Sequence, residues 1–296
     1  MTSSSASASP SDRARACVGV VGAGFLGGPL ASRLAATRRV IATTRSGARE
    51  GDAPAGVEMR AVDVVQGSDE ALRAALVGVE ALVVAYAAGR QQDRRAVYVD
   101  GTRRLLEAWT PAGASLGARR VVYVSSTSAL PDVDGWVDET AAAWPTSERG
   151  RVQREGEEVI REVCEARGLP WIILRLGGLY GPGRGLGRIY RSDPERALAG
   201  DGMQATNLIH RDDAIAAAHA ALDAPAELSA LIHVVDDDHR PRREMYARLA
   251  AAMGRPAPRW ELPAAAQAGG KRVRNDRLRE LLGVALRYPQ HVVDPD

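Results

Sequence analysis

Short apolar runs alternate with segments of helical spacing along most of the chain. The runs lie at 18–21, 40–45, 57–64, 81–85, 120–124, 171–176 and 230–235. Most of them are continuous, as is typical of strands buried on both faces of a parallel sheet. Helical segments separate them, so the pattern predicts an α/β fold with a Rossmann-type, doubly wound parallel sheet.

The expected helices have recognisable start and stop signals. Ser68 precedes a helix that runs through Leu76, and Thr146 or Ser147 precedes one that runs to about Ala166. Further helices are expected at 28–34, 97–109, from Asp212 or Asp213 onward, at 241–253 and at 275–282. Two stretches are expected to be irregular: 131–145, a solvated acidic loop, and 177–184, a tight Gly/Pro loop.

The chain is expected to form one domain with two additions. Residues 1–16 are rich in Ser and Ala and predict a disordered tail. Residues 17–296 predict the Rossmann-type domain, with a small C-terminal cap contributed by about 179–206 and 237–290.

A glycine-rich turn follows the first strand and predicts a nucleotide site. Gly22, Gly24 and Gly27 form a G-x-G-x-x-G pattern between an apolar strand and a helix. In this context the first glycine permits a tight turn, the second lets the backbone approach a pyrophosphate, and the third lets helix and strand pack closely. The alternative is an ordinary structural turn.

The end of the second strand favours NADP over NAD. NAD-preferring sites place a carboxylate there to hold the ribose 2′-hydroxyl. This chain has Thr44, Arg45 and Ser46 instead, and a guanidinium with hydroxyls suits a 2′-phosphate. The alternative is that Arg45 is a solvated loop residue.

The charge and apolar composition of the chain limit the classes of partner that it could bind. The net charge is +2 and the arginines are scattered, which argues against nucleic acid and anionic membranes, and no apolar stretch is long enough to span a membrane. Cys17 and Cys164 have no metal-ligand spacing, are expected to be reduced core residues, and fit a cytoplasmic location. Lys271 is the single lysine, so a mechanism that requires a lysine elsewhere is excluded. It begins a basic run, 271–274, that is expected to be a solvated face, with a phosphate site as the alternative. A small-molecule substrate is expected, and a homodimer is left open.

Several motifs occur together in one order. They are Gly22–Gly27, Asp63-Val64, Gly101-Thr102, Ser125-Ser126-Thr127, Arg175 with 180–184, and 207–213. Together they resemble the extended or atypical branch of the short-chain dehydrogenase/reductase superfamily, which includes NAD-dependent epimerases and dehydratases. The resemblance covers nearly everything from Cys17 to Tyr288.

The resemblance implies an NAD(P) site and a substrate cap. The implied cofactor residues are Gly22, Gly24, Phe25, Leu26, Gly27, Thr44, Arg45, Ser46, Asp63, Val64, Ala87 and Ser125. The implied substrate residues are Tyr86, Arg184, Asn207 and His210, although a structural role is the alternative for His210. Thr127 takes the place of the family's catalytic Ser/Thr, and no metal site is expected.

The chain departs from this family at its catalytic Tyr-x-x-x-Lys dyad. Arg149 stands at the tyrosine position and Gln153 at the lysine position. Arginine does not release its proton at usable pH and glutamine does not titrate, so the usual proton relay is missing. Three responses stay open. Another phenol acts, with Tyr86, Tyr98 and Tyr180 as candidates; Thr127 and Arg149 stabilise an oxyanion while water supplies the proton; or redox chemistry is absent.

The leading hypothesis is therefore an NADP(H)-binding atypical short-chain dehydrogenase/reductase. It would transfer hydride between cofactor and a small polar or secondary-metabolite substrate. The alternatives are a non-redox isomerase, cyclase or dehydratase on the same scaffold, and a cofactor-sensing regulatory protein.

Overall fold

The computed structural model describes residues 16–47, 53–110, 120–187, 197–265 and 269–292. Nearly all of the tail expected at 1–16, and residues 188–196 of the expected cap, lie outside this part of the chain. Two compact units are present. The first comprises residues up to 125 together with 147–174 and 218–231, and the second comprises 126–146, 175–217 and 232–296.

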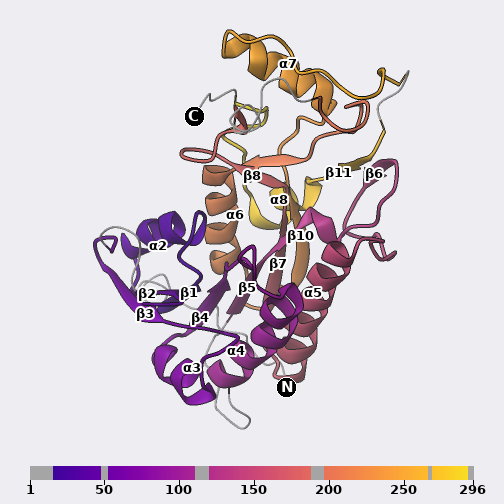
Figure 1. The fold of residues 1–296 in the computed structure, drawn as a ribbon. Coiled ribbons are helices and arrows are strands. Elements are labelled where there is room, and N and C mark those ends of the chain that lie inside the picture. Colours follow the sequence, from indigo (N-terminus) through magenta and orange to yellow (C-terminus); the bar gives the residue numbers. More distant parts are fainter. Residues whose placement is uncertain (1–15, 48–52, 111–119, 188–196, 266–268, 293–296) are drawn as a thin grey trace. The chain divides into compact units, whose positions relative to one another are not determined.

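A seven-stranded sheet confirms the predicted α/β fold (Figure 1). Its order is β10-β7-β5-β4-β1-β2-β3. The strands are β1 Val18–Val21, β2 Val40–Thr44, β3 Val57–Ala61, β4 Ala81–Val84, β5 Arg120–Ser126, β7 Trp171–Leu176 and β10 Ala230–Val234. Each corresponds to one of the apolar runs, and β1 and β7 are buried throughout.

The strand order reverses beside β1. The chain moves outward from β1 through β2 to β3, then crosses back so that β4 pairs with β1 in parallel and β5 pairs with β4. Right-handed crossovers running in opposite directions place their helices on opposite faces of a sheet. The carboxyl ends of β1 and β4 therefore meet at a topological switch point, where α/β folds bind their ligands.

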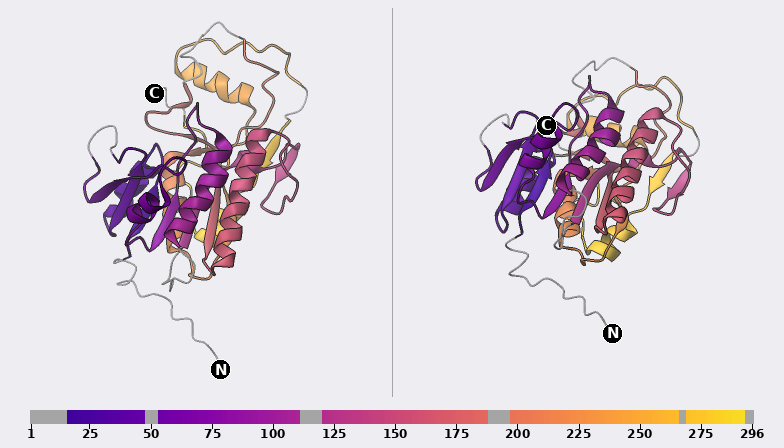
Figure 2. Two further views of the ribbon diagram at one scale, coloured as in Figure 1. Left: turned by 60° about the horizontal axis from the view of Figure 1, so that its bottom comes forward. Right: turned by 90° about the horizontal axis from the view of Figure 1, so that it is seen from below.

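Helices cover the sheet as the crossovers require. Helix α2 packs on β1, β2 and β3, whereas α3, α4 and α5 pack against one another in sequence order (Figure 2). The helices are α2 Gly27–Ala35, α3 Asp69–Ala75, α4 Gly101–Trp109, α5 Glu148–Ala166, α6 Arg211–Asp223, α7 Arg242–Ala252 and α8 Asp276–Leu282. No helix in the described ranges combines the length and apolar composition that a membrane span needs.

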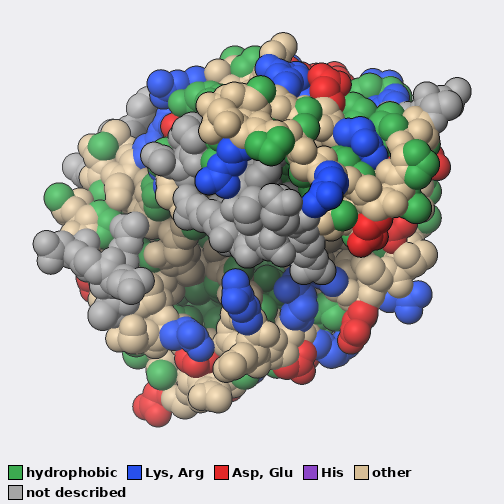
Figure 3. Space-filling view, turned by 45° about the horizontal axis from the view of Figure 1, so that its top comes forward, with side chains coloured by type: hydrophobic (Ala, Val, Ile, Leu, Met, Phe, Trp, Pro, Cys, Tyr) green, Lys and Arg blue, Asp and Glu red, His purple; other side chains and the backbone are tan. Residues whose placement is uncertain are grey.

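The predicted caps of two helices are confirmed. The Ser68 hydroxyl accepts a hydrogen bond from the Ala71 amide at the start of α3, and Ser147 accepts one from the Gly150 amide at the start of α5. Cys17 and Cys164 are buried and free, as expected. Lys and Arg side chains occur at many places on the face shown in Figure 3, in keeping with their scatter along the sequence.

The second unit contains two small parallel strand pairs. Strand β6 (Gly135–Val137) pairs with β11 (Lys271–Val273), and β8 (Gly178–Tyr180) pairs with β9 (Leu208–His210). A 3₁₀ turn, η2 (Thr127–Ala129), follows β5.

Three local expectations were wrong. The stretches 131–145 and 177–184 are not entirely irregular, because they contain β6 and β8. The helix expected at 97–109 begins as a π-helix, η1 (Ala96–Asp100), before it becomes α4. The acidic stretch is also not simply solvated: the Glu139 side chain is only 4% exposed and accepts a hydrogen bond from the His233 amide.

Candidate functional site

The glycine turn between β1 and α2 is closed on two sides and open in the middle. A Cβ at Gly22, where φ is +102°, would lie 2.5 Å from the Tyr86 amide nitrogen, and a Cβ at Gly27 would lie 2.1 Å from the Gly22 carbonyl oxygen. A Cβ at Gly24 would meet nothing within 4 Å. Only the middle glycine therefore borders open space, which is the property that a close approach of pyrophosphate requires.

The N-terminus of α2 is not capped by a side chain. Leu26 occupies the N-cap position and makes no side-chain cap hydrogen bond, and no acidic residue lies in the first turn. Helices α3 and α5, by contrast, begin with serine caps. An uncapped helix N-terminus carries partial positive charge and N–H groups that point out of the helix end, which suits an anion. The turn and the helix start thus fit the phosphates of a dinucleotide.

Asp63 lies beyond the end of β3 and is held as a carboxylate. Its Oδ1 accepts hydrogen bonds of 2.9 Å from the amides of Gln66 and Val65. These bonds, with the Gln66 amide contributing most, lower the pKa of Asp63, and the charges of Arg45 and Arg104 act in the same direction. Val64 is buried and packs against Gly101. Strand β2 ends at Thr44, and Arg45 and Ser46 follow it.

The residues after β4 differ in exposure. Ala87 is exposed, whereas the Tyr86 hydroxyl forms a 2.6 Å hydrogen bond with Thr102 Oγ1. Burial raises the pKa of Tyr86 well above its usual value. The Tyr98 hydroxyl accepts a hydrogen bond from the Ala88 amide. Both phenols therefore support the segment that follows β4.

At the expected dyad position the structure shows a buried polar network. Gln153 is 3% exposed, and its Nε2 donates to Ser125 Oγ at 3.2 Å and to the Tyr123 hydroxyl at 3.4 Å. Ser125 Oγ in turn donates to Glu157 Oε1 at 2.5 Å. Burial raises the pKa of Tyr123 well above the ordinary phenol value, so it stays neutral. The helix α5 also carries Arg149, which is exposed.

Tyr123 and Glu157 are parts of this network that were not predicted from the sequence. Glu157 lies one helical turn after Gln153, and Tyr123 lies two residues before Ser125 on the same face of β5. Those spacings place residues on a shared face. They were the signal available in the sequence.

The remaining predicted residues lie in the second unit. Thr127 is partly buried and starts η2, and Arg184 is exposed and closes a turn with Gly181. Tyr180 and His210 stand opposite each other in the β8–β9 pair, with ring centroids 5.3 Å apart.

Tyr180 and His210 are both buried and engaged. The Tyr180 hydroxyl accepts a hydrogen bond from the Val292 amide, and burial raises its pKa to about 12. His210 Nδ1 accepts one from the Asp212 amide, the ring packs on Tyr288, and burial lowers the pKa of His210. These contacts favour the structural alternative for His210.

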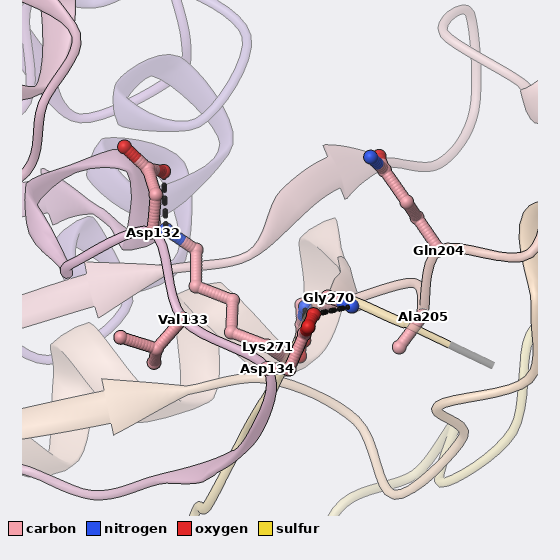
Figure 4. Close-up of a pocket in the computed structure, with 8 residues that line it drawn as sticks. Asp132, Val133, Asp134, Gln204, Ala205, Gly270 and Lys271 are labelled. Carbon is pink, nitrogen blue, oxygen red and sulfur yellow. Dashed lines mark hydrogen bonds and ion pairs between the residues drawn. The ribbon is translucent and has the colours of Figure 1, made fainter. Parts of the chain in front are cut away.

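A polar pocket of about 370 Å³ lies wholly within the second unit (Figure 4). Lys271 lies along it, and Asn207 forms part of its wall. The basic run at 271–274 was expected to be a solvated face, which is wrong for Lys271: its side chain is 19% exposed and donates to the carbonyl oxygens of Leu130 and Pro131. In the described part of the chain, no three His, Cys, Asp or Glu side chains gather as metal ligands.

Comparison with known proteins agrees with this geometry. The model of the NAD dependent epimerase/dehydratase family matches residues 18–234. Protein YeeZ of Escherichia coli K12 is 30% identical over 287 residues, covering 94% of this chain and 98% of that protein. The 2′-dehydrokanamycin reductase of Streptomyces kanamyceticus is 34% identical over 162 residues, covering 51% of this chain and 46% of that protein.

A solved structure shares the fold across nearly the whole chain. The UDP-glucuronic acid 4-epimerase of Bacillus cereus, in complex with NAD, has a TM-score of 0.75 at 19% identity and covers 94% of each chain. The glycine turn, the switch point and the family match all agree on one assignment. The chain belongs to the NAD-dependent epimerase/dehydratase family, among NAD(P)-dependent oxidoreductase or epimerase-like enzymes.

Proposed function

We propose that the protein is an NADP(H)-dependent reductase that acts on a carbonyl or alcohol of a small polar or secondary-metabolite substrate. The observation that carries the proposal is the turn at Gly24, which is open to a ligand where Gly22 and Gly27 are closed by backbone. The partial match to a 2′-dehydrokanamycin reductase supports reduction over other chemistries of the family.

The preference for NADP rests on the end of β2. Thr44 ends that strand, and the exposed Arg45 follows where an NAD-preferring site would have a carboxylate. Its guanidinium can form paired hydrogen bonds to a 2′-phosphate. Asp63 nearby is a carboxylate that anchors the turn after β3, and the charge of Arg45 contributes to lowering its pKa.

When bound, the reduced nicotinamide supplies a hydride. The chain's own residues must then bind the substrate oxygen and bring it a proton. Thr127 is the proposed hydrogen-bond donor to that oxygen, and the exposed Arg149 adds positive charge that stabilises an oxyanion. Water is the proposed proton source, because the hydroxyls of Tyr86, Tyr98 and Tyr180 are all hydrogen-bonded within the protein and burial raises the pKa values of Tyr86 and Tyr180.

Gln153 is the proposed positioning residue of this site. Its amide nitrogen is fixed by Ser125 and Tyr123, and Ser125 is fixed by Glu157. Both hydrogens of Nε2 are used in these bonds, so only Gln153 Oε1 can accept from a bound ribose, and a neutral amide cannot lower the pKa of a neighbouring phenol. This is consistent with proton delivery from solvent.

The test is to titrate the protein with NADPH and with NADH and to follow binding by its intrinsic tryptophan fluorescence. We expect NADPH to bind more tightly, and Arg45→Glu to reduce that preference by about tenfold or more, because a like charge replaces a paired one. Arg73→Glu, an exposed change on α3, is the matched control and should leave the preference unchanged. Equal affinity for both cofactors in the parent and the Arg45 variant would refute the NADP assignment.

One observation favours a second candidate, a non-redox isomerase, cyclase or dehydratase. The group at the lysine position of the dyad does not titrate. Measuring turnover by protein stripped of its cofactor distinguishes the reductase from the non-redox enzyme, since only the non-redox enzyme would stay active.

A further inference from the structure

The pocket of the second unit has a fixed floor. Strand β11 pairs in parallel with β6, with Lys271 opposite Gly135. The Asn207 side chain ties this strand from the other side: its Nδ2 donates to the Lys271 carbonyl at 2.9 Å, and its Oδ1 accepts from the Val273 amide at 2.8 Å. The Ala205 amide bonds to the Gly269 carbonyl at 2.9 Å. All three segments that line the pocket are therefore held by backbone bonds.

Two carboxylates line the pocket, and each is anchored through one oxygen. Asp132 Oδ2 accepts from the amide and the hydroxyl of Thr146, and Asp134 Oδ1 accepts from the Gly270 amide at 2.6 Å. Among the residues the structure describes, the other oxygen of each has no hydrogen bond of normal length; Asp132 Oδ1 stands 3.7 Å from Lys271 Nζ. Both carboxylates are thus oriented and still able to accept.

Lys271 supplies one positive charge against these two negative ones. It extends from the strand toward Asp132, with Val133 beside its methylene stem (Figure 4). Its Nζ is held by the carbonyl oxygens of Leu130 and Pro131 at 3.1 and 3.3 Å. The lining therefore carries a net charge of −1, which disfavours anions and favours a ligand with a cationic group.

The rest of the lining is both apolar and neutral polar. Val133, Ala205 and the Lys271 stem offer apolar surface, and the exposed Gln204 amide offers a donor and an acceptor across the opening. Such a mixture matches a ring that has C–H faces and hydroxyl edges. The volume of about 370 Å³ lies in the range of small-molecule pockets.

We propose that this pocket binds an amine-bearing, polyhydroxylated ring of the amino-sugar class. The ammonium of the ligand lies between Asp132 and Asp134, and its hydroxyls bond to the amide of Gln204. The inference goes beyond the proposed function, since it requires no cofactor and names a site that the reductase proposal does not use.

The test measures calorimetric binding of 2-amino-2-deoxyglucose, with glucose and glucuronate as neutral and anionic probes. The amino sugar should bind most tightly and glucuronate least. Asp134→Asn and Asp132→Asn should each weaken the amino sugar by about fivefold, because each removes a half-exposed charge pair, while the affinity for glucose changes little. In both variants the asparagine Oδ1 can still accept the anchoring hydrogen bond, so folding is preserved.

Glu280→Gln is the matched control, because Glu280 is an exposed carboxylate on α8 outside the pocket. It should leave all three affinities unchanged. The same samples are titrated with NADPH, so a failed sugar site and a failed cofactor site give separate results. Equal binding of the three sugars, no binding by any of them, or equal losses in Glu280→Gln and Asp134→Asn would overturn the proposal.

Discussion

His233 shows how burial at one residue makes stability depend on pH. It is fully buried on β10, and its Nδ1 lies 3.1 Å from the Arg274 carbonyl oxygen, so the neutral ring donates from Nδ1. Burial, with the charge of Arg175 as the next cause, lowers the pKa of His233 to about 3. A histidine in the unfolded chain titrates near 6.5.

We predict that His233 destabilises the fold as pH falls below 6.5. Between about pH 3 and 6.5 the unfolded chain binds a proton at this residue and the folded chain does not, so stability decreases with acidification. From pH 7 to pH 5 the loss attributable to His233 is about 2 kcal/mol. Urea unfolding of the parent and of His233→Gln at both pH values measures it, and equal losses in the two proteins would contradict the prediction.

Glu139 also contributes to the pH dependence of stability. Subtracting the loss measured for His233→Gln from that of the parent protein removes this contribution. Burial raises the pKa of that carboxyl, so its contribution falls as pH rises through its folded pKa, opposite to His233. His233→Gln leaves the His233 amide, which donates to Glu139, in place.

At the scale of one element, two glycines of the β1–α2 turn have different roles, one in folding and one in cofactor binding. The Gly27 position has no room for a methyl group, and the obstructing atom is a backbone carbonyl oxygen. The Gly24 position has room in the free protein. The two glycines are three residues apart and should respond to the same substitution in different ways.

We predict that Gly27→Ala costs about 1–3 kcal/mol of stability, as overpacking of a close contact does. Gly24→Ala should leave the melting temperature within about 1 °C but weaken NADPH binding at least about tenfold, because the methyl group occupies space next to the expected pyrophosphate. Thermal melts and cofactor titrations of both variants measure this. Full NADPH affinity in Gly24→Ala would argue against a dinucleotide at this turn.

Elements with a strong local pattern were predictable from sequence, and those made by distant pairing were not. The seven sheet strands all coincide with apolar runs, most of them continuous, and the serine caps of α3 and α5 are local signals. Strands β6 and β11 contain three residues each and exist because they pair with each other across more than 130 residues of chain. No local pattern could predict that pairing.

The same reason explains the errors at individual residues. Lys271 looked solvated because its neighbours are basic, yet β11 places it against the carbonyls of Leu130 and Pro131. Glu139 lies in an acidic stretch but reaches His233 on β10. The cofactor turn was predictable because strand, glycines and helix are contiguous in sequence.

At the scale of the whole molecule, each of the two units is built from several separate segments of the chain. The chain passes between them after residues 125, 146, 174, 217 and 231. Strands β7 and β10 each contribute residues to both units. Unfolding one unit therefore breaks strands that the other unit also uses.

We predict a single thermal transition that NADPH shifts as a whole. A ligand at about 100 times its Kd stabilises the folded state by about 2.7 kcal/mol, which for a chain of 296 residues corresponds to a rise in melting temperature of about 4 °C. Far-ultraviolet dichroism and tryptophan fluorescence should report the same midpoint with and without cofactor. Two transitions, of which NADPH moves one, would show that the units unfold independently.

The single lysine gives acylation chemistry an unusual meaning in this protein. An activated ester can form a stable amide at one side chain only, that of Lys271, which is 19% exposed. The mass of one peptide then reports the occupancy of one site, and its rate of labelling is a footprint of whatever stands before that amine. A reagent that is normally unselective would act here as a reporter for the wall of the pocket.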